Sequence, residues 1–190
     1  LPQARMECDK FDGLMPDIRA QKGFVGWVHR HSGVPLLIDV AEGKLTMDEF
    51  VASLTDEELA DLLGGQANTG VANTFGFGNN PYHGIPNAMT ADGPAGLRIN
   101  RECGVCTTAF PCSTMLACSW DPELVFKVGE TAAKEVKENN IAIWLTPAIN
   151  IHRSPLCGRN FEYYSEDPFL AGKLAAAMVQ GIQSQNISPS

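Results

Sequence analysis

The sequence has no cluster of lysine or arginine, and its acidic residues outnumber the basic ones by 22 to 14, for a formal net charge of −8. Nucleic acids and anionic lipid surfaces are bound through clustered positive charge. We therefore expect neither nucleic acid nor a membrane surface as a partner. The sequence also lacks any apolar run near the ~18–20 residues that a membrane-spanning helix needs.

The sequence begins with Leu1 rather than methionine, and no charged stretch followed by an apolar one comes after it. A secretory signal has that pattern, so we expect a cytoplasmic protein. The missing methionine indicates that the chain is a piece of a longer polypeptide. Its 190 residues, 44% of them hydrophobic, suffice for one globular domain or for part of a larger one.

A repeating cysteine pattern is also missing, although six cysteines are present. Cys103 and Cys106 form a CxxC pair, but a zinc site needs a second pair of ligands at suitable spacing, and none is in reach. No helix start follows the pair, as a thioredoxin-like site would require. His29 and His31 have a chelating spacing, but surface histidines are the favoured interpretation. We expect reduced thiols, no metal and no cofactor.

Residues 1–40 contain glycines and prolines that break any period, and we interpret them as a linker or lead-in segment. Residues 41–190 form the domain. Two capping boxes, Thr46–Glu49 and Thr55–Glu58, predict two successive leader helices, the second ending at Gly64. Their predicted buried residues are Phe50, Val51, Leu54, Leu59, Leu62 and Leu63.

A loop rich in glycine and asparagine follows, over residues 65–84. Gly65–Gly70 has the outer spacing of a phosphate-binding loop, but it lacks the Lys-Ser/Thr pair that holds phosphates, which excludes a nucleotide site. Phe75, Phe77 and Tyr82 either line a sugar-sized pocket or pack under the loop.

The second half alternates strands with helices. The pattern predicts strands at Ala88–Ala91, Thr114–Ala117 and Ile141–Leu145, and helices at Leu124–Asn139 and Phe169–Gln183. Residues Leu124, Val125, Val128, Ala132 and Val136 are the predicted inward face of the first of these helices. Such alternation is typical of a parallel sheet covered by helices. A closed (β/α)₈ barrel takes roughly 250 residues. We therefore predict an α/β fold, the incomplete N-terminal part of a TIM-type barrel preceded by two leader helices.

Two segments carry charged side chains that could bind a ligand or take part in catalysis. Residues 141–168 read as a buried strand, a polar loop with several charged side chains, and a helix capped by Asp167-Pro168. Loops after strand carboxyl ends are where α/β folds build sites. Asp92 ends an earlier strand in an Asp-Gly-Pro turn, where it serves a ligand or merely organises its own turn. Arg98, six residues on, is a partner for a carboxylate or for hydroxyls.

Three segments resemble the N-terminal domain of glycoside hydrolase family 3, the β-glucosidase and β-xylosidase group. They are Leu62-Leu-Gly-Gly65, Asp92-Gly-Pro-Ala-Gly-Leu-Arg98 and Gly158-Arg-Asn-Phe-Glu-Tyr-Tyr-Ser-Glu-Asp-Pro168. The resemblance covers the chain from about residue 40 and implies a retaining β-glycosidase, most simply a β-glucosidase. Double displacement through two carboxylates about 5 Å apart is the implied mechanism.

Carried over by residue, the resemblance implies that Asp92 accepts hydrogen bonds from hydroxyls of the terminal sugar in subsite −1. Arg98 and Arg159 lie in the same subsite, donating to hydroxyls or holding carboxylates. Glu162 matches the motif as well, with either a binding or a structural role. The implied partners are a β-linked oligosaccharide or glucoside substrate, the rest of the barrel, and a sandwich domain that precedes or follows it.

The family's remaining site elements lie beyond Ser190: a Lys-His pair on the next strand, an aspartate nucleophile, and a general acid from a following domain. We therefore expect no catalytic residue within this chain and no activity from it alone. One alternative is a sugar-binding or structural domain of the same fold without catalysis. Another is the same fold acting on N-acetylhexosamines. The polar start of the chain also suggests a permuted order, with the sandwich domain ahead of the barrel.

Overall fold

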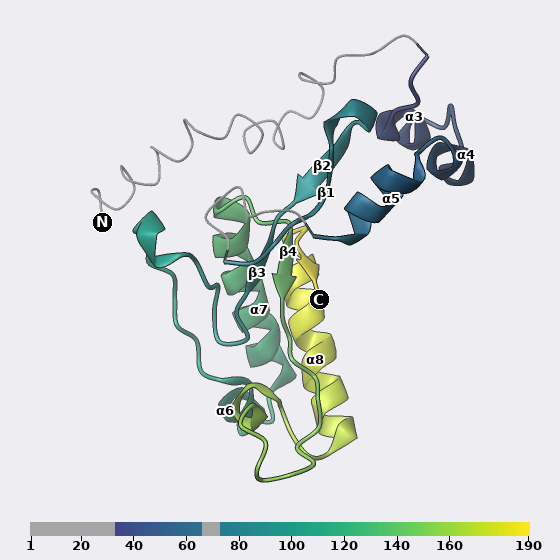
Figure 1. Ribbon diagram of the computed structural model, residues 1–190. Coiled ribbons are helices and arrows are strands. Elements are labelled where there is room, and N and C mark those ends of the chain that lie inside the picture. Colours follow the sequence, from purple (N-terminus) through teal and green to yellow (C-terminus); the bar gives the residue numbers. More distant parts are fainter. Residues whose placement is uncertain (1–32, 66–72) are drawn as a thin grey trace.

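The computed structural model describes residues 33–65 and 73–190 (Figure 1). The predictions for His29 and His31 lie outside these residues, as do residues 66–70 of the Gly65–Gly70 spacing and most of the lead-in segment. The helices are α3 (Leu37–Ala41), α4 (Met47–Ala52), α5 (Asp56–Leu63), α6 (Ser113–Ala117), α7 (Pro122–Glu138) and α8 (Pro168–Gln183). The strands are β1 (Phe77–Asn80), β2 (Ile85–Ala88), β3 (Thr90–Asp92), β4 (Ile143–Leu145) and β5 (Ser188–Pro189). Short 3₁₀ turns are η1 (Pro81–His83), η2 (Arg101–Cys103) and η3 (Asn160–Glu162).

Three short parallel strands form the sheet of the second half of the chain. Their order is β3-β4-β5, and the register places Asp92 beside Leu145 at the carboxyl ends of β3 and β4. Successive side chains of a strand point to opposite faces. Ala91 and Trp144 are buried in the core that includes the helices. Asp92 and Leu145 therefore lie on the face away from that core.

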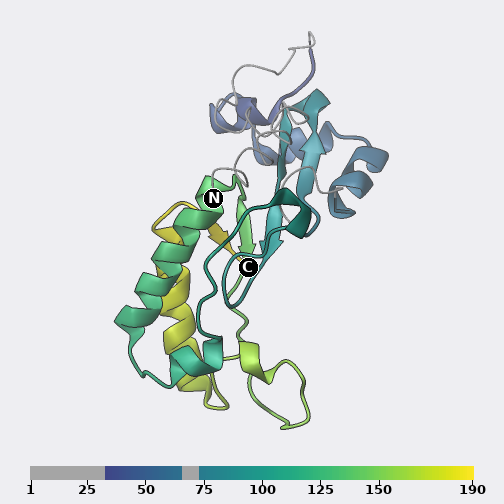
Figure 2. The ribbon, with the colours of Figure 1, turned by 90° about the vertical axis from the view of Figure 1, so that its left-hand side faces the viewer.

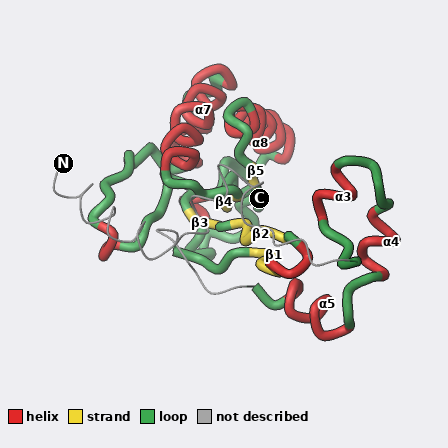
Figure 3. The backbone as a smooth tube through the Cα atoms, turned by 90° about the horizontal axis from the view of Figure 1, so that it is seen from above, coloured by secondary structure: helices red, strands yellow, loops and turns green. Residues whose placement is uncertain are grey.

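Helices α7 and α8 pack against each other on one side of this sheet, as the view from above shows (Figure 3). Both begin with an aspartate N-cap, Asp121 or Asp167, whose side chain accepts two backbone N–H bonds, and both have proline at the first helical position. The helices confirm the predicted ones to within two residues at each end. The prediction that Leu124 faces inward is wrong, because this side chain is 42% exposed.

The two capping boxes form as predicted, and α4 and α5 are the leader helices. Thr46 and Thr55 each accept a backbone N–H from the glutamate three residues later. The predicted burial is only partly right: Phe50 is buried, whereas Leu63 is 87% exposed. The preceding helix α3 was not predicted, since its five residues have no period. The Asp39 carboxylate closes its first turn by accepting the N–H of Leu36 at 3.2 Å.

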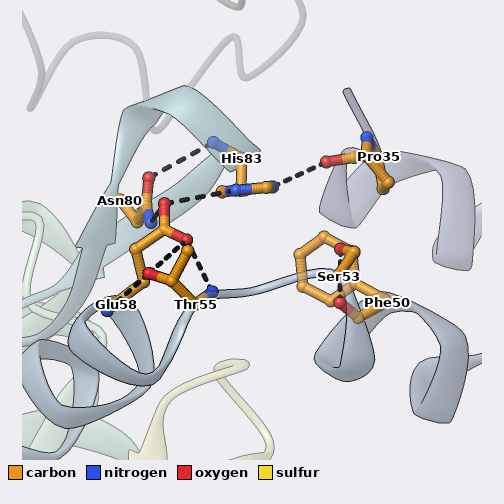
Figure 4. Close-up of polar contacts among 7 residues, drawn as sticks. All are labelled: Pro35, Phe50, Ser53, Thr55, Glu58, Asn80 and His83. Carbon is orange, nitrogen blue, oxygen red and sulfur yellow. Dashed lines mark hydrogen bonds and ion pairs between the residues drawn. The ribbon is translucent and has the colours of Figure 1, made fainter. Parts of the chain in front are cut away.

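A buried histidine ties the leader helices to the antiparallel β1–β2 hairpin (Figure 4). His83 Nδ1 lies 2.9 Å from the Pro35 carbonyl oxygen, and its Nε2 lies 3.2 Å from Glu58 Oε1. Asn80 donates to the same Glu58 oxygen at 3.1 Å, and the Phe50 ring meets the imidazole edge-on. Because both ring nitrogens face oxygen acceptors, one side chain joins three separate segments.

The prediction of a strand at Thr114–Ala117 is wrong, since helix α6 occupies that segment. A run of four residues without a period fits a strand and a buried helical turn equally well. Tertiary contacts decide here, because Thr114 Oγ1 lies 2.7 Å from the Tyr163 carbonyl and 3.0 Å from that of Asn160. The turn thereby fastens to the loop after β4. Strand β3 pairs directly with β4, with no strand between them.

Candidate functional site

The predicted site residues lie in the loops that follow β3 and β4. The first loop begins at Asp92, and the second spans residues 146–167, between β4 and α8. In Figures 1 and 2 the second loop lies beside α6, at the end of the molecule away from α3, α4 and α5. Because β3 and β4 are parallel, both loops begin at the same end of the sheet, where the two strands have their carboxyl ends.

Asp92 is held by two side chains that contact one of its carboxylate oxygens. Asn73 Nδ2 donates to Oδ2 at 3.2 Å, and Arg98 Nη1 lies 3.7 Å from the same oxygen. Oδ1 has no partner among residues 33–65 and 73–190, and the side chain is 40% exposed. One oxygen is therefore fixed, while the other is available to accept a hydrogen bond from a bound hydroxyl.

The turn after Asp92 requires glycine. Gly93 has a φ of +146°, which side-chain-bearing residues rarely adopt, and a Cβ there would lie 1.7 Å from the Gly96 carbonyl oxygen. The Asp92 carbonyl accepts the N–H of Arg98 at 2.9 Å. The turn thus folds back and brings the Arg98 guanidinium beside the Asp92 carboxylate.

Arg159 and Glu162 form a second charged pair, with Arg159 Nε donating to Glu162 Oε1. The Glu162 side chain is only 8% exposed, whereas that of Arg159 is 72% exposed. The hydrogen bond that Arg159 donates to Glu162, together with the negative charge of Glu162, raises the pKa of Arg159 above its ordinary value. Glu162 therefore anchors a charged guanidinium whose Nη groups have no partner among the described residues.

The loop after β4 is braced from within. His152 Nε2 lies 2.7 Å from the Asn160 carbonyl and 3.1 Å from that of Tyr163. Because carbonyls only accept, this ring nitrogen carries a proton. The backbone N–H of His152 donates to the Ser165 carbonyl at 3.2 Å. The side-chain Nδ2 of Asn160 donates to the Ser154 carbonyl at 2.8 Å. Four carbonyls bound in this way hold the loop that presents Arg159.

The structure thus groups the four predicted residues as two pairs, Asp92 with Arg98 and Arg159 with Glu162. No hydrogen bond or ion pair between the two pairs occurs in the described part of the chain. Sequence reasoning missed Asn73, which lies in a loop with several asparagines, so nothing in the pattern singles it out. Phe75, Phe77 and Tyr82 in the same region are 67%, 50% and 49% exposed.

The described residues contain no group of three or more histidine, cysteine or acidic side chains placed to hold a metal ion. Cys103 is buried, and Cys106 is exposed. Within the described ranges, no helix has the length and apolar character needed to cross a membrane.

Three comparisons with known proteins identify relatives of one family. Residues 65–190 match the model of the glycosyl hydrolase family 3 N terminal domain. The chain is 61% identical, over 173 residues, to beta-glucosidase A of Butyrivibrio fibrisolvens, covering 90% of this chain and 21% of that protein. A beta-glucosidase structure from Paenibacillus barengoltzii matches with 38% identity and a TM-score of 0.76, covering 90% of this chain and 19% of that one.

A third match is beta-glucosidase 3B of Thermotoga neapolitana in complex with alpha-D-glucose. It is 41% identical with a TM-score of 0.67, covering 75% of this chain and 22% of that one. The chain thus spans about a fifth of the length of these relatives. The family model covers more than half of the chain, and the relatives agree with it. The chain therefore belongs to the family of the glycosyl hydrolase family 3 N terminal domain.

Proposed function

We propose that this chain is the part of a retaining β-glucosidase that holds the terminal β-D-glucosyl residue in subsite −1. Residues 41–190 are the first part of a (β/α)₈ barrel, and residues 1–40 lead into it. Three parallel strands with helices on one side support this assignment. So do the relatives, which are beta-glucosidases of whose length this chain covers about a fifth.

The observation that carries the proposal is the position of the two charged pairs. Each follows one of two adjacent parallel strands, and Asp92 lies on the sheet face that a closed barrel encloses. Asp92 Oδ1 accepts from sugar hydroxyls, while Arg98 and Arg159 donate to them. Charged, forked donors and acceptors match pairs of hydroxyls well in a partly dry pocket. Glu162 acts through Arg159, whose position it fixes.

These residues bind and orient the sugar; they do not react with it. In a retaining glycosidase one carboxylate attacks the anomeric carbon while a carboxylic acid protonates the leaving oxygen. We assign neither role to this chain, so residues 1–190 alone are inactive. The binding energy from Asp92, Arg98 and Arg159 places the anomeric carbon where those two groups meet.

The test is Arg159→Ala in the full-length enzyme, assayed with 4-nitrophenyl β-D-glucoside. We expect kcat/KM to fall about 10²–10³-fold, as when one preorganised donor is removed from an active site. Arg153→Ala is the matched control, because this exposed arginine belongs to the same loop but lies outside the family motif. The control is expected to keep a near-normal rate, with both variants folded by circular dichroism.

A near-normal rate for Arg159→Ala would show that the loop is scaffolding. A full-length protein that binds glucose but hydrolyses no β-glucoside would support the alternative, a sugar-binding domain without catalysis.

A further inference from the structure

We propose that Asn73 is the positioning residue of Asp92, holding its carboxylate so that Oδ1 faces the sugar. The inference rests on the proposed function, since it assigns Asn73 a role only through the sugar-binding task of Asp92. The two residues are 19 positions apart, and Asn73 belongs to none of the motifs identified above.

The contact between them has two parts. Asn73 Oδ1 accepts the backbone N–H of Asp92 at 3.0 Å, and Asn73 Nδ2 donates to Asp92 Oδ2 at 3.2 Å. A single side-chain amide thus forms hydrogen bonds with both the main chain and the side chain of Asp92. Because its two ends point at two atoms of Asp92, the amide fixes the direction of the carboxylate as well as its place.

The orientation of the backbone groups of β3 explains why Asn73 can form these two hydrogen bonds. The Met89 carbonyl accepts the backbone N–H of Ile143, the first residue of β4, at 3.0 Å. Successive residues of a strand turn their backbone groups to opposite edges, so Thr90 and Asp92 turn theirs to the edge away from β4. The segment after residue 72 runs along that edge, and Thr74 Oγ1 donates to the Thr90 carbonyl at 2.7 Å. Among the described residues, this segment is what bonds to that edge of β3.

Asn73 differs from its neighbour Thr74 in what it holds. Thr74 contacts the backbone carbonyl and the hydroxyl of Thr90. Asn73 instead reaches the Asp92 carboxylate, which is 40% exposed. Arg98 lies 3.7 Å from the same Oδ2 but is itself 64% exposed. Asn73 is thus the short, closely bonded contact that keeps Oδ2 occupied and leaves Oδ1 for a ligand.

Three variants of the full-length enzyme separate this role from simple edge closure. Asn73→Ala removes both contacts. Asn73→Asp keeps an acceptor for the Asp92 N–H but replaces the donor with an oxygen that repels the carboxylate. Thr74→Val removes the neighbouring contact to β3 and leaves Asp92 untouched, so it is the matched control.

The assay is kcat/KM with 4-nitrophenyl β-D-glucoside, together with the Asp92→Asn variant and its double with Asn73→Ala. We expect about 10- to 100-fold losses for both Asn73 variants, the range for a hydrogen bond to a charged group. Thr74→Val is expected within about threefold of wild type. In the Asp92→Asn background, Asn73→Ala should cost little more, since the group it positions is already impaired.

The inference is overturned if Asn73→Asp is as active as Thr74→Val, or if the losses from Asn73→Ala and Asp92→Asn simply multiply. Either result would reduce Asn73 to a strand-edge contact. The Asp92→Asn variant keeps the two proposals apart: if it is fully active, the proposed function itself fails. If it is impaired while both Asn73 variants are normal, only this inference fails.

Discussion

At the scale of single residues, the sequence predicted charged site residues but not the contacts that come from distant segments. Arg98 was predicted as a partner for a carboxylate or for hydroxyls, and in the structure it forms an ion pair with Asp92. Asn73 was not predicted, since its contact with Asp92 depends on how a separate segment runs along β3. Glu162 had two open interpretations, and its burial against Arg159 favours the structural one. Long-range contacts of this kind leave no local pattern.

Glu58 allows a prediction about pH. Hydrogen bonds from the Thr55 N–H and the Asn80 amide lower the pKa of Glu58 below 4.5, with the charge of His83 adding to them. A depressed pKa means that the carboxylate stabilises the leader helices above its unfolded pKa. This stability is lost as the pH falls through the lower folded value. We therefore expect Glu58→Gln to weaken protection near neutral pH and to have less effect in acid.

The measurement is deuterium exchange of residues 46–65 in the full-length protein, with wild type and variant compared at each pH. The gap in protection is expected to be widest near neutral pH and to narrow as the pH falls below 4.5. Glu57→Gln is the control, because the Glu57 side chain has no hydrogen-bonding partner among the described residues. A gap that stays constant with pH would contradict the role given to the Glu58 charge.

At the scale of elements, long segments with clear end signals were predicted well. Helices α7 and α8 have an Asp-Pro start and a long apolar period, and α4 and α5 have full capping boxes. Short segments were predicted unevenly: β4 lies within the strand predicted at Ile141–Leu145, whereas α6 and β5 were not predicted. Residues 113–117 form a helix because Thr114 is bound by the loop after β4. Strand β5 was not predicted, since two residues carry no period.

The packing of α7 against α8 depends on glycine at one close contact. A Cβ on Gly181 would lie 2.2 Å from the Phe126 carbonyl oxygen and 3.0 Å from Glu130 N, both backbone atoms of α7. Gly181→Ala must push the helices apart, and overpacking of this kind costs about 1–3 kcal/mol. Gly172→Ala is the matched substitution in the same helix, because its Cβ would meet nothing within 4 Å.

We expect the two substitutions to shift the melting temperature of the full-length protein in opposite directions. Gly181→Ala should lower it, whereas Gly172→Ala should raise it, because alanine is favoured over glycine in helices by up to about 1 kcal/mol. Equal melting temperatures for the two variants would show that the helices do not approach as closely as described.

At the scale of the whole molecule, the chain provides a helix-covered sheet whose other face carries Thr90, Asp92 and Leu145. The fold class followed from the alternation of strands and helices, and the comparisons support a mixed α/β family 3 domain. The barrel and the assignment of both reacting carboxylates to other parts of the enzyme belong to the proposed function. We propose that this chain provides one part of an active site, the part that binds the sugar.

The most direct test of that assignment is a crystal structure of the full-length enzyme with glucose bound. We expect glucose hydroxyls within about 3 Å of Asp92 Oδ1 and of an Arg159 Nη atom, with Asn73 still bonded to Asp92 Oδ2. A glucose molecule bound in the active site without contact to either Asp92 or Arg159 would contradict it.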